Sequence, residues 1–329
     1  MAQETLWIVC VLLTAYVFDF INGFHDAANS IATIVTTKVL TPFQAVLWAA
    51  LFNFIAFLFF KMAVAKTIGT DLIDMSIIDS YLIFSALFSA IVWGLLTWYY
   101  GMPSSSSQAL IGGLVGAAII KGGWSTLQWS GLFKIMMGIL VTPFIGLLAS
   151  VLVMFVINRL LRVRHTKTNQ TVFKSLQLIS SACLSITHGT NDAQKTMGII
   201  TVLLFSCSWL QGPFFVPLWV VITCHLALAL GTLTGGWRIV KTMGTKITNL
   251  NPVRGCAAET GAALAILTAS EFGVPVSTTQ TVAGSIAGVG LFHSARQLNW
   301  TTLRQMMLSW LLTIPATASL AALMMRVIT

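Results

Sequence analysis

The sequence predicts an all-α polytopic membrane protein made of two inverted-topology repeats, each with about five membrane elements. Composition is the first observation: 57% of the 329 residues are hydrophobic and only 8% are charged, which lies far outside the range of soluble domains. The second is that the apolar segments are continuous and do not alternate with period two as in a β-barrel. The third is that one set of motifs occurs twice, in the same order.

The apolar segments divide into about ten elements of roughly 17–25 residues, the length that crosses a bilayer as helix. In the first half we expect them at 5–36, 44–64, 80–100, 104–120 and 131–158. In the second half we expect them at 175–206, 215–237, 256–272, 275–291 and 304–327. The third and fourth elements of each half form either two spans or one re-entrant hairpin, and both alternatives return the chain to the same side.

The first element of each half is too long for one straight span, and each contains a glycine next to a polar residue. These pairs are Asn22-Gly23 and His188-Gly189. Glycine weakens a helix, and polar side chains can satisfy the backbone groups that a break sets free. We therefore expect both long elements to be broken helices at these pairs.

Four separated motifs indicate an internal duplication. The matching pairs are 18–29 with 184–195, 66–70 with 241–245, 101–108 with 273–280, and Pro143 with Pro315. Because five elements per half is an odd number, the second copy must lie upside down relative to the first. We assign 1–158 to the first repeat, 159–174 to a basic linker and 175–329 to the second repeat. In carriers of this kind the substrate lies near the midplane, between the repeats.

The basic residues predict the orientation. The formal net charge is +9, but the lysines and arginines gather in short loops, most densely in 159–174. Cytoplasmic loops carry such an excess, so we place this linker in the cytoplasm, both termini outside, and the chain in the cell (inner) membrane. The same distribution argues against a nucleic-acid partner. Five scattered cysteines match neither a disulfide framework nor a zinc site, and we expect no cofactor.

Each half carries an aspartate inside an apolar segment, Asp26 and Asp192. A carboxylate at membrane depth is costly unless it is neutralised, so it indicates an ion or substrate site. On a helix, Asp19, Asn22, Asp26 and Asn29 share one face, and their aligned partners are Ser185, His188, Asp192 and Lys195. The residues that we expect to handle the coupling ion are Asp26, Asp192, Asn22, Asn191, His25, His188, Gln108 and Gln280. Hydrogen bonding between packed spans is the alternative.

The duplicated Pro-Ser/Thr segments suit an oxyanion. Proline is favourable in the first turn of a helix, and serine or threonine caps the exposed N–H groups. Such a helix start offers hydroxyl and amide donors together with the positive end of the helix dipole. The residues that we expect to bind the substrate are Ser105, Ser106, Ser107, Ser277, Thr278, Thr279, Asn29 and Lys195. Ordinary capping of membrane helices is the alternative.

Taken together, these motifs resemble the inorganic phosphate transporter (Pit) family of secondary carriers. That family has a duplicated motif close to G-A-N-D-x-A-N, which 23–29 and 189–195 resemble, and P-V-S-T-T-H segments, which 103–108 and 275–280 resemble. The resemblance covers essentially the whole chain. It implies proton- or sodium-coupled uptake of inorganic phosphate by an inverted-repeat helical protein, often a homodimer. The motif forms are most similar to bacterial low-affinity, proton-coupled members, which are associated with neutral metal–phosphate substrates.

Departures from the family pattern bear on the coupling ion. His25 replaces an asparagine, and Lys195 stands where the first half has Asn29. A titratable ring and a fixed ammonium favour protons over sodium, and sodium at Asp26, Asn29 and Asp192 is the alternative. Gln108 and Gln280 stand where the family usually has histidine, which removes two candidate proton carriers.

Two glutamates of the second half have no clear counterpart in the first. Glu259 lies deep in an apolar segment and is a further candidate proton site. Glu271 lies near the end of the same segment, and we expect it to be a structural or interfacial residue.

The sequence therefore predicts a proton-coupled phosphate symporter that works by alternating access and is not an enzyme. The nearest alternative is a permease for sulfate or another tetrahedral oxyanion. An intramembrane aspartyl protease also needs two membrane aspartates, but the sequence lacks a GxGD-type motif. A channel is a third alternative. The expected partners are inorganic phosphate, the lipid bilayer and a second copy of the chain.

Overall fold

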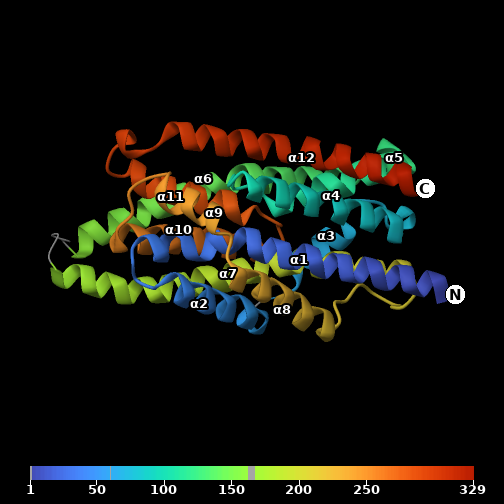
Figure 1. The fold of residues 1–329 in the computed structure, drawn as a ribbon, viewed down its shortest axis with the longest axis horizontal. Coiled ribbons are helices and arrows are strands. Elements are labelled where there is room, and N and C mark those ends of the chain that lie inside the picture. The colour runs from blue at the N-terminus through green and yellow to red at the C-terminus, as the bar shows by residue number, and fades with distance from the viewer. Residues whose placement is uncertain (1, 60, 162–166) are drawn as a thin grey trace.

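The computed structural model describes residues 2–59, 61–161 and 167–329, which form an elongated bundle of α-helices (Figure 1). Within these ranges β-structure is limited to one isolated bridge between Ile73 and Leu127. The predicted all-α fold is confirmed. Residues 162–166 of the predicted basic linker lie outside the described residues, and its other residues belong to the two flanking helices.

Twelve α-helices lie within the described residues. Those of the first half are α1 (Ala2–Thr36), α2 (Pro42–Ile55), α3 (Ala63–Thr70), α4 (Ser80–Tyr99), α5 (Ser106–Gly122) and α6 (Trp129–Leu161). Those of the second half are α7 (Lys167–Ser206), α8 (Leu218–Thr234), α9 (Trp237–Thr245), α10 (Pro252–Glu271), α11 (Thr278–Leu291) and α12 (Trp300–Ile328). The short 3₁₀ turns are η1 (Ala56–Leu58), η2 (Met75–Ile77), η3 (Trp124–Thr126) and η4 (Ala295–Gln297).

The same order of elements occurs in both halves: a long helix, a bent pair, two shorter helices and a second long helix. Packing follows the same pattern, because α1 contacts α8 as α7 contacts α2, and α5 contacts α12 as α11 contacts α6. Figure 1 shows both termini at one end of the molecule, where α1 begins, whereas α7 begins at the opposite end. An inverted repeat requires this arrangement, and its inversion across a membrane stays a prediction.

The expected break within the first element of each half is wrong, because α1 and α7 are continuous helices of 35 and 40 residues. The two glycines serve close packing instead. A side chain at Gly23 would meet the backbone of Leu228 in α8, and one at Gly189 would meet the backbone of Asn53 in α2. The broken helices of the fold are the bent pairs, at 81° between α2 and α3 and at 74° between α8 and α9.

Four of the described helices are long and apolar enough to cross a membrane, namely α1, α4, α6 and α12, and each bent pair would add one span. This is fewer than the ten expected elements. Polar residues in the middle of α7 lower its hydropathy, and α5 and α11 have only 17 and 14 residues. Figure 1 shows α4 and α5 towards the end with the termini, and α10 and α11 towards the other end. This arrangement favours the hairpin alternative.

Two apolar cores lie along the bundle, and α1 and α7 each pass from one to the other. Helix α1 contributes Phe18 to one core and Ala27 to the second, whereas α7 contributes Leu184 to the second and Ala193 to the first. The polar motifs of both helices therefore lie where the cores meet. Charges buried there must be compensated by protein groups or by a ligand.

Candidate functional site

Four elements bring polar side chains together where the cores meet: the middles of α1 and α7, and the N-terminal ends of α5 and α11. The carboxylates of Asp26 and Asp192 are both buried. Together with the ring of His188 they offer ligand atoms that all lie within 4.8 Å of one another. The structure thus places the two duplicated aspartates in one cluster, although they belong to different halves of the chain.

The start of α5 uses its three serines in three ways. Ser105 caps the helix, because its hydroxyl accepts a hydrogen bond from the backbone N–H of Gln108 at 3.2 Å. Ser106 donates to Oδ2 of Asp26 at 3.2 Å. Ser107 reaches the other hairpin and donates to the backbone carbonyl of Val276 at 2.7 Å. One of the three hydroxyls therefore faces the carboxylate cluster.

The start of α11 directs two hydroxyls at the cluster. Its cap is Ser277. Thr278 donates towards Asp192, at 3.3 Å from Oδ1, and Thr279 donates to Oδ1 of Asp26 at 3.1 Å. The amide of Asn29 lies beside both threonines, with Nδ2 at 3.3 and 3.1 Å from their hydroxyl oxygens. This hairpin end therefore contacts the carboxylates of both halves.

Each aspartate has its own basic partner on the same helix. Nδ1 of His25 lies 2.7 Å from Oδ1 of Asp26. On α7 the ammonium of Lys195, one turn away, donates to Oδ1 of Asp192 at 2.7 Å, and Nε2 of His188 lies 3.5 Å from Oδ2. Lys195 is fully buried, so this ion pair is shielded from water, and removing either partner would leave a bare buried charge.

Residues that the sequence did not single out hold the two histidine rings in place. Thr97 and Ser104 both lie 3.3 Å from Nε2 of His25 and 2.8 Å from each other. Asn53 of α2 lies 3.2 Å from Nδ1 of His188 and donates to Thr232 of α8. Thr97 and Asn53 are single polar residues in apolar segments, and that isolation is the only signal the sequence offers.

Four predicted coupling residues contribute less directly. Asn191 donates to Ser270 instead of to the cluster, and Oε1 of Gln108 is buried without a hydrogen bond. Gln280 takes part through its backbone, because its N–H donates to the capping hydroxyl of Ser277. Asn22 is buried with no hydrogen bond at either side-chain atom. It lines a cavity of about 10 Å³ between α1, α4 and α5, close to the minimum for one water molecule.

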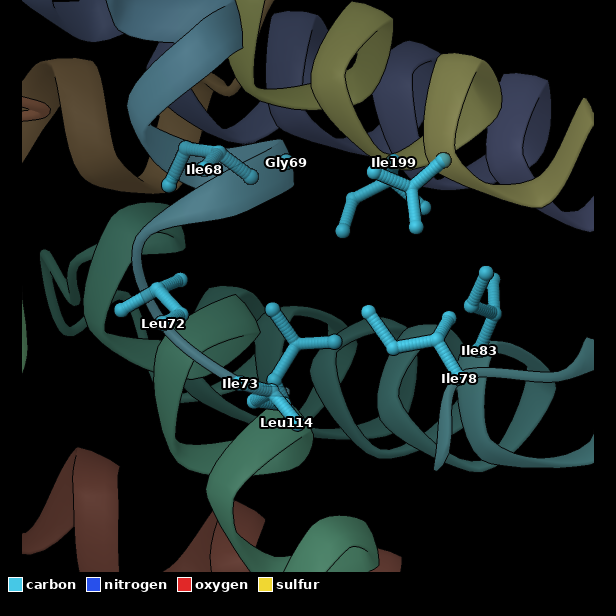
Figure 2. Close-up of a pocket in the computed structure, with 9 residues that line it drawn as sticks. Ile68, Gly69, Leu72, Ile73, Ile78, Ile83, Leu114 and Ile199 are labelled. Atoms are coloured by element: carbon cyan, nitrogen blue, oxygen red, sulfur yellow. The ribbon is translucent and has the colours of Figure 1, made fainter. Parts of the chain in front are cut away.

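A second cavity does not suit an anion. Figure 2 shows it between α3, α4, α5 and α7, where the labelled side chains that point into it are aliphatic. Its lining residues are Ile68, Gly69, Leu72, Ile73, Ile78, Ile83, Leu114, Ile199 and Val202. An oxyanion there would find no side-chain hydrogen bond, and desolvating it would be costly.

Glu259 forms a separate polar cluster rather than joining the aspartates. Its carboxylate accepts hydrogen bonds from Thr33 of α1 at 2.6 Å, and from Gln177 and Ser180 of α7 at 2.9 and 2.5 Å. Three donors on two neighbouring helices fix this side chain in α10. Glu271 is exposed at the end of the same helix.

Comparisons with known proteins agree over nearly the whole chain. The sequence profile described as "Phosphate transporter family" matches residues 22–321. A protein of Rhizobium meliloti (strain 1021), named "probable low-affinity inorganic phosphate transporter", is 52% identical over 317 residues, which are 96% of this chain and 95% of that one. A protein of Bacillus subtilis (strain 168) with the same name is 41% identical with the same coverage.

One solved structure has the same fold. It is described as "The sodium-dependent phosphate transporter", and it matches with a TM-score of 0.89 over 98% of this chain and 99% of that one. The sequence identity is 23%.

Proposed function

The chain belongs to the phosphate transporter family, and from this premise we propose that it imports inorganic phosphate by cation-coupled symport, with the proton as coupling ion. The relatives that match over nearly their full length are named as transporters. These names support a transporter over an intramembrane protease. The finer statements, on the ion and on the role of each residue, rest on the geometry of the carboxylate cluster.

The observation that carries the coupling is where the hydroxyl donors point. Ser106, Thr278 and Thr279 all donate to the carboxylates of Asp26 and Asp192. A hydroxyl has one proton to donate, so these donors cannot serve a phosphate oxygen and a carboxylate at once. A cation that binds the carboxylates would release the hydroxyls to the anion. Phosphate and cation would therefore bind together, as symport requires.

Charge balance supports the same coupling. The cluster contains two aspartates and a single fixed cation, Lys195, which is already paired with Asp192. Phosphate would add at least one further negative charge at a place with almost no access to solvent. Uncompensated charges are costly in such surroundings. Phosphate binding without an accompanying cation is therefore disfavoured.

The proton is the coupling ion that best fits these contacts. The nearest oxygens of Asp26 and Asp192 already face His25 and Lys195, and a proton needs only one oxygen atom, whereas a hard metal cation takes several. Sodium is the second candidate, because Oδ1 of Asn29 is a buried oxygen without a hydrogen bond. This oxygen would be a sodium ligand in addition to the carboxylates of Asp26 and Asp192.

Phosphate fits the cluster better than sulfate does. Hydroxyl donors lie next to carboxylate acceptors in the cluster, and protonated phosphate both accepts and donates hydrogen bonds. Sulfate only accepts hydrogen bonds. Its oxygens would therefore face the carboxylate oxygens with no proton between them, and the two negative groups would repel each other. A neutral metal–phosphate complex is a further form of the substrate, and the donor set of Asp26, His188 and Asp192 suits a divalent metal as cargo.

We extend the proposal to the setting of the transporter. Both chain ends would lie outside, with the basic loop in the cytoplasm of a cell whose inner membrane holds the protein. Broad exposed apolar faces, with residues such as Phe144, Leu148 and Leu311, would contact lipid and a second copy of the chain in a homodimer.

The test is uptake of labelled phosphate by proteoliposomes, with a pH gradient and a sodium gradient imposed in separate experiments. We expect accumulation with an inward proton gradient and a much weaker effect of sodium. Unlabelled sulfate in excess should compete poorly. Accumulation that follows only the sodium gradient would refute proton coupling, and equal competition by sulfate would refute phosphate selectivity. Phosphate flux that ignores both gradients would indicate a channel.

A further inference from the structure

Four acidic side chains are buried in the described part of the chain, and one of them has neither an ion pair nor a hydrogen bond within 3.5 Å. These residues are Asp19, Asp26, Asp192 and Glu259. Asp26 faces His25, Asp192 pairs with Lys195, and Glu259 accepts three hydrogen bonds. Both carboxyl oxygens of Asp19, in contrast, are buried without any hydrogen bond. An isolated ionised carboxyl in such a place is strongly disfavoured.

The surroundings of Asp19 offer little to a metal ion. The side chains that lie beside its carboxyl are Asn22, one turn along α1, and Thr196 of α7, and the polar atoms of both are themselves without hydrogen bonds. The charged or titratable groups that act on it are Lys195 and Asp192 of α7, with Tyr16 and Cys224 of α1 and α8 nearby. The ammonium of Lys195 would repel a metal cation.

We propose that Asp19 holds the co-transported proton in transit to and from the substrate cluster, as a site separate from the aspartates that face the substrate. A proton makes this carboxyl neutral and lets it donate to Asn22 or Thr196. When the proton leaves, the carboxylate stands uncompensated in the core until another cation or a structural change relieves it. The group is therefore suited to alternate between two states during the transport cycle. This inference rests on the proposed function, because it names the carrier of the coupling ion.

The position of Asp19 links it to the substrate cluster. It precedes Asp26 by two helical turns, or about 10 Å along α1. Asn22 lies between them on the same face and lines the small cavity that also contacts His25 and Ser106. A water molecule in that cavity would join the neighbourhood of Asp19 to the imidazole beside Asp26. Phe18 and Ile21 also line this cavity, so a proton would follow its polar side, along Asn22, His25 and Ser106.

The decisive variant is Asp19→Asn, which keeps the shape of the side chain and removes its exchangeable charge. It is compared with the wild type in two assays on the same proteoliposomes: accumulation of labelled phosphate under a pH gradient, and exchange of labelled for unlabelled phosphate with no gradient. The matched control is Asp74→Asn, because Asp74 is an exposed residue that caps the N-terminus of η2, outside the bundle core. Phosphate-dependent pH changes inside the vesicles give the third measurement.

We expect Asp19→Asn to keep phosphate exchange near the wild-type rate and to lose both accumulation and the internal pH change. Asp19→Glu, which restores a titratable group, should recover accumulation at least in part. Accumulation by Asp19→Asn equal to that of Asp74→Asn would overturn the proposal. So would loss of exchange by an Asp19→Asn protein that elutes as a single folded species, because that result makes Asp19 part of substrate binding or of the fold.

Failure of the proposed function would look different. A wild type without phosphate exchange would refute phosphate transport itself, and the role of Asp19 with it. A wild type that accumulates phosphate only with sodium, together with an Asp19→Asn protein that loses this dependence, would replace the proton at Asp19 by sodium.

Discussion

The polar stretches of α1 and α7 occupy equivalent places in the two halves, yet they neutralise their aspartates in different ways. Asp26 has an imidazole beside it, whereas Asp192 is bound by an ammonium from the next turn. Histidine changes its charge around neutral pH, and lysine keeps its charge. The aligned residues Asn29 and Lys195 differ in the same sense, because Asn29 serves the hairpin hydroxyls and Lys195 serves its own carboxylate. The two halves share one arrangement of helices. Their sequences differ in that one aspartate lies beside a lysine, a residue of fixed charge, and the other beside a histidine, a residue of adjustable charge.

The largest effect should come from removing the fixed charge. Lys195→Ala leaves the buried Asp192 with the ring of His188 at 3.5 Å and the hydroxyl of Thr278. Losing one partner of a buried ion pair costs about 3–5 kcal/mol of stability. We expect no phosphate uptake and a clearly lower unfolding temperature in detergent. The double variant Lys195→Ala/Asp192→Ala removes both charges and should recover part of the thermal stability. If Lys195→Ala unfolds at the wild-type temperature, the ion pair is not the fixed element of α7.

The next largest effect should come from removing the charge of Asp26 in α1. Asp26→Asn keeps the hydrogen bonds to Ser106 and Thr279 within reach but removes the charge that a cation would neutralise. We expect an abolished phosphate uptake with little change in the unfolding temperature, measured in proteoliposomes and in detergent. Normal uptake by this variant would remove Asp26 from the mechanism.

The hairpin hydroxyls should have intermediate effects. Ser106→Ala and Thr278→Ala each remove one donor to the substrate, and a hydrogen bond to a charged group contributes about 1.5 kcal/mol, or roughly a tenfold rise in KM. The maximal rate should change less. Thr142→Ala is the matched control, because Thr142 is buried in α6 and bonds only within its own helix. A KM of Thr278→Ala equal to that of Thr142→Ala would contradict substrate binding by α11.

A smaller effect is expected from the adjustable charge itself. His25→Asn introduces the amide that the aligned family motif carries and removes the imidazole that lies 2.7 Å from Asp26. Phosphate uptake by this variant should persist, but its rate should vary less than that of the wild type between about pH 6 and about pH 8. Uptake assays in buffers across this range measure the difference. A wild-type pH profile in this variant would place the adjustable charge elsewhere.

The smallest effect should come from a charge pair outside the cluster. Lys121 and Asp79 form a partly exposed ion pair between the ends of α5 and α4. Exposed pairs contribute about 0–1 kcal/mol, so Lys121→Ala should leave uptake and thermal stability close to wild type. A loss as large as that of Lys195→Ala would erase the distinction between the cluster and the rest of the molecule.

The duplicated motifs predicted much of this arrangement, because residues repeated in register reveal which segments must meet. Asp26, Asp192 and the starts of α5 and α11 could be paired in this way from the sequence alone. Gly23 and Gly189 could not be interpreted, since a glycine permits both a break and a close helix crossing, and only the neighbouring helix decides between them. Thr97 and Asn53 were missed for a related reason: a lone hydroxyl or amide acquires its role from a partner distant in sequence.

The bond between Ser107 and the carbonyl of Val276 has a mechanical consequence. It joins the start of α5 to the start of α11. The equivalent bond from α11 to α5 is not formed, because Thr279, the counterpart of Ser107, donates to Asp26 instead. Among the described residues the bond from Ser107 joins the two hairpin tips directly, and breaking it would cost about 0.5–1.5 kcal/mol. In the proposed alternating-access cycle, thermal motion would suffice to break such a bond at every turnover. Parting the hairpin tips would then not be the slow step.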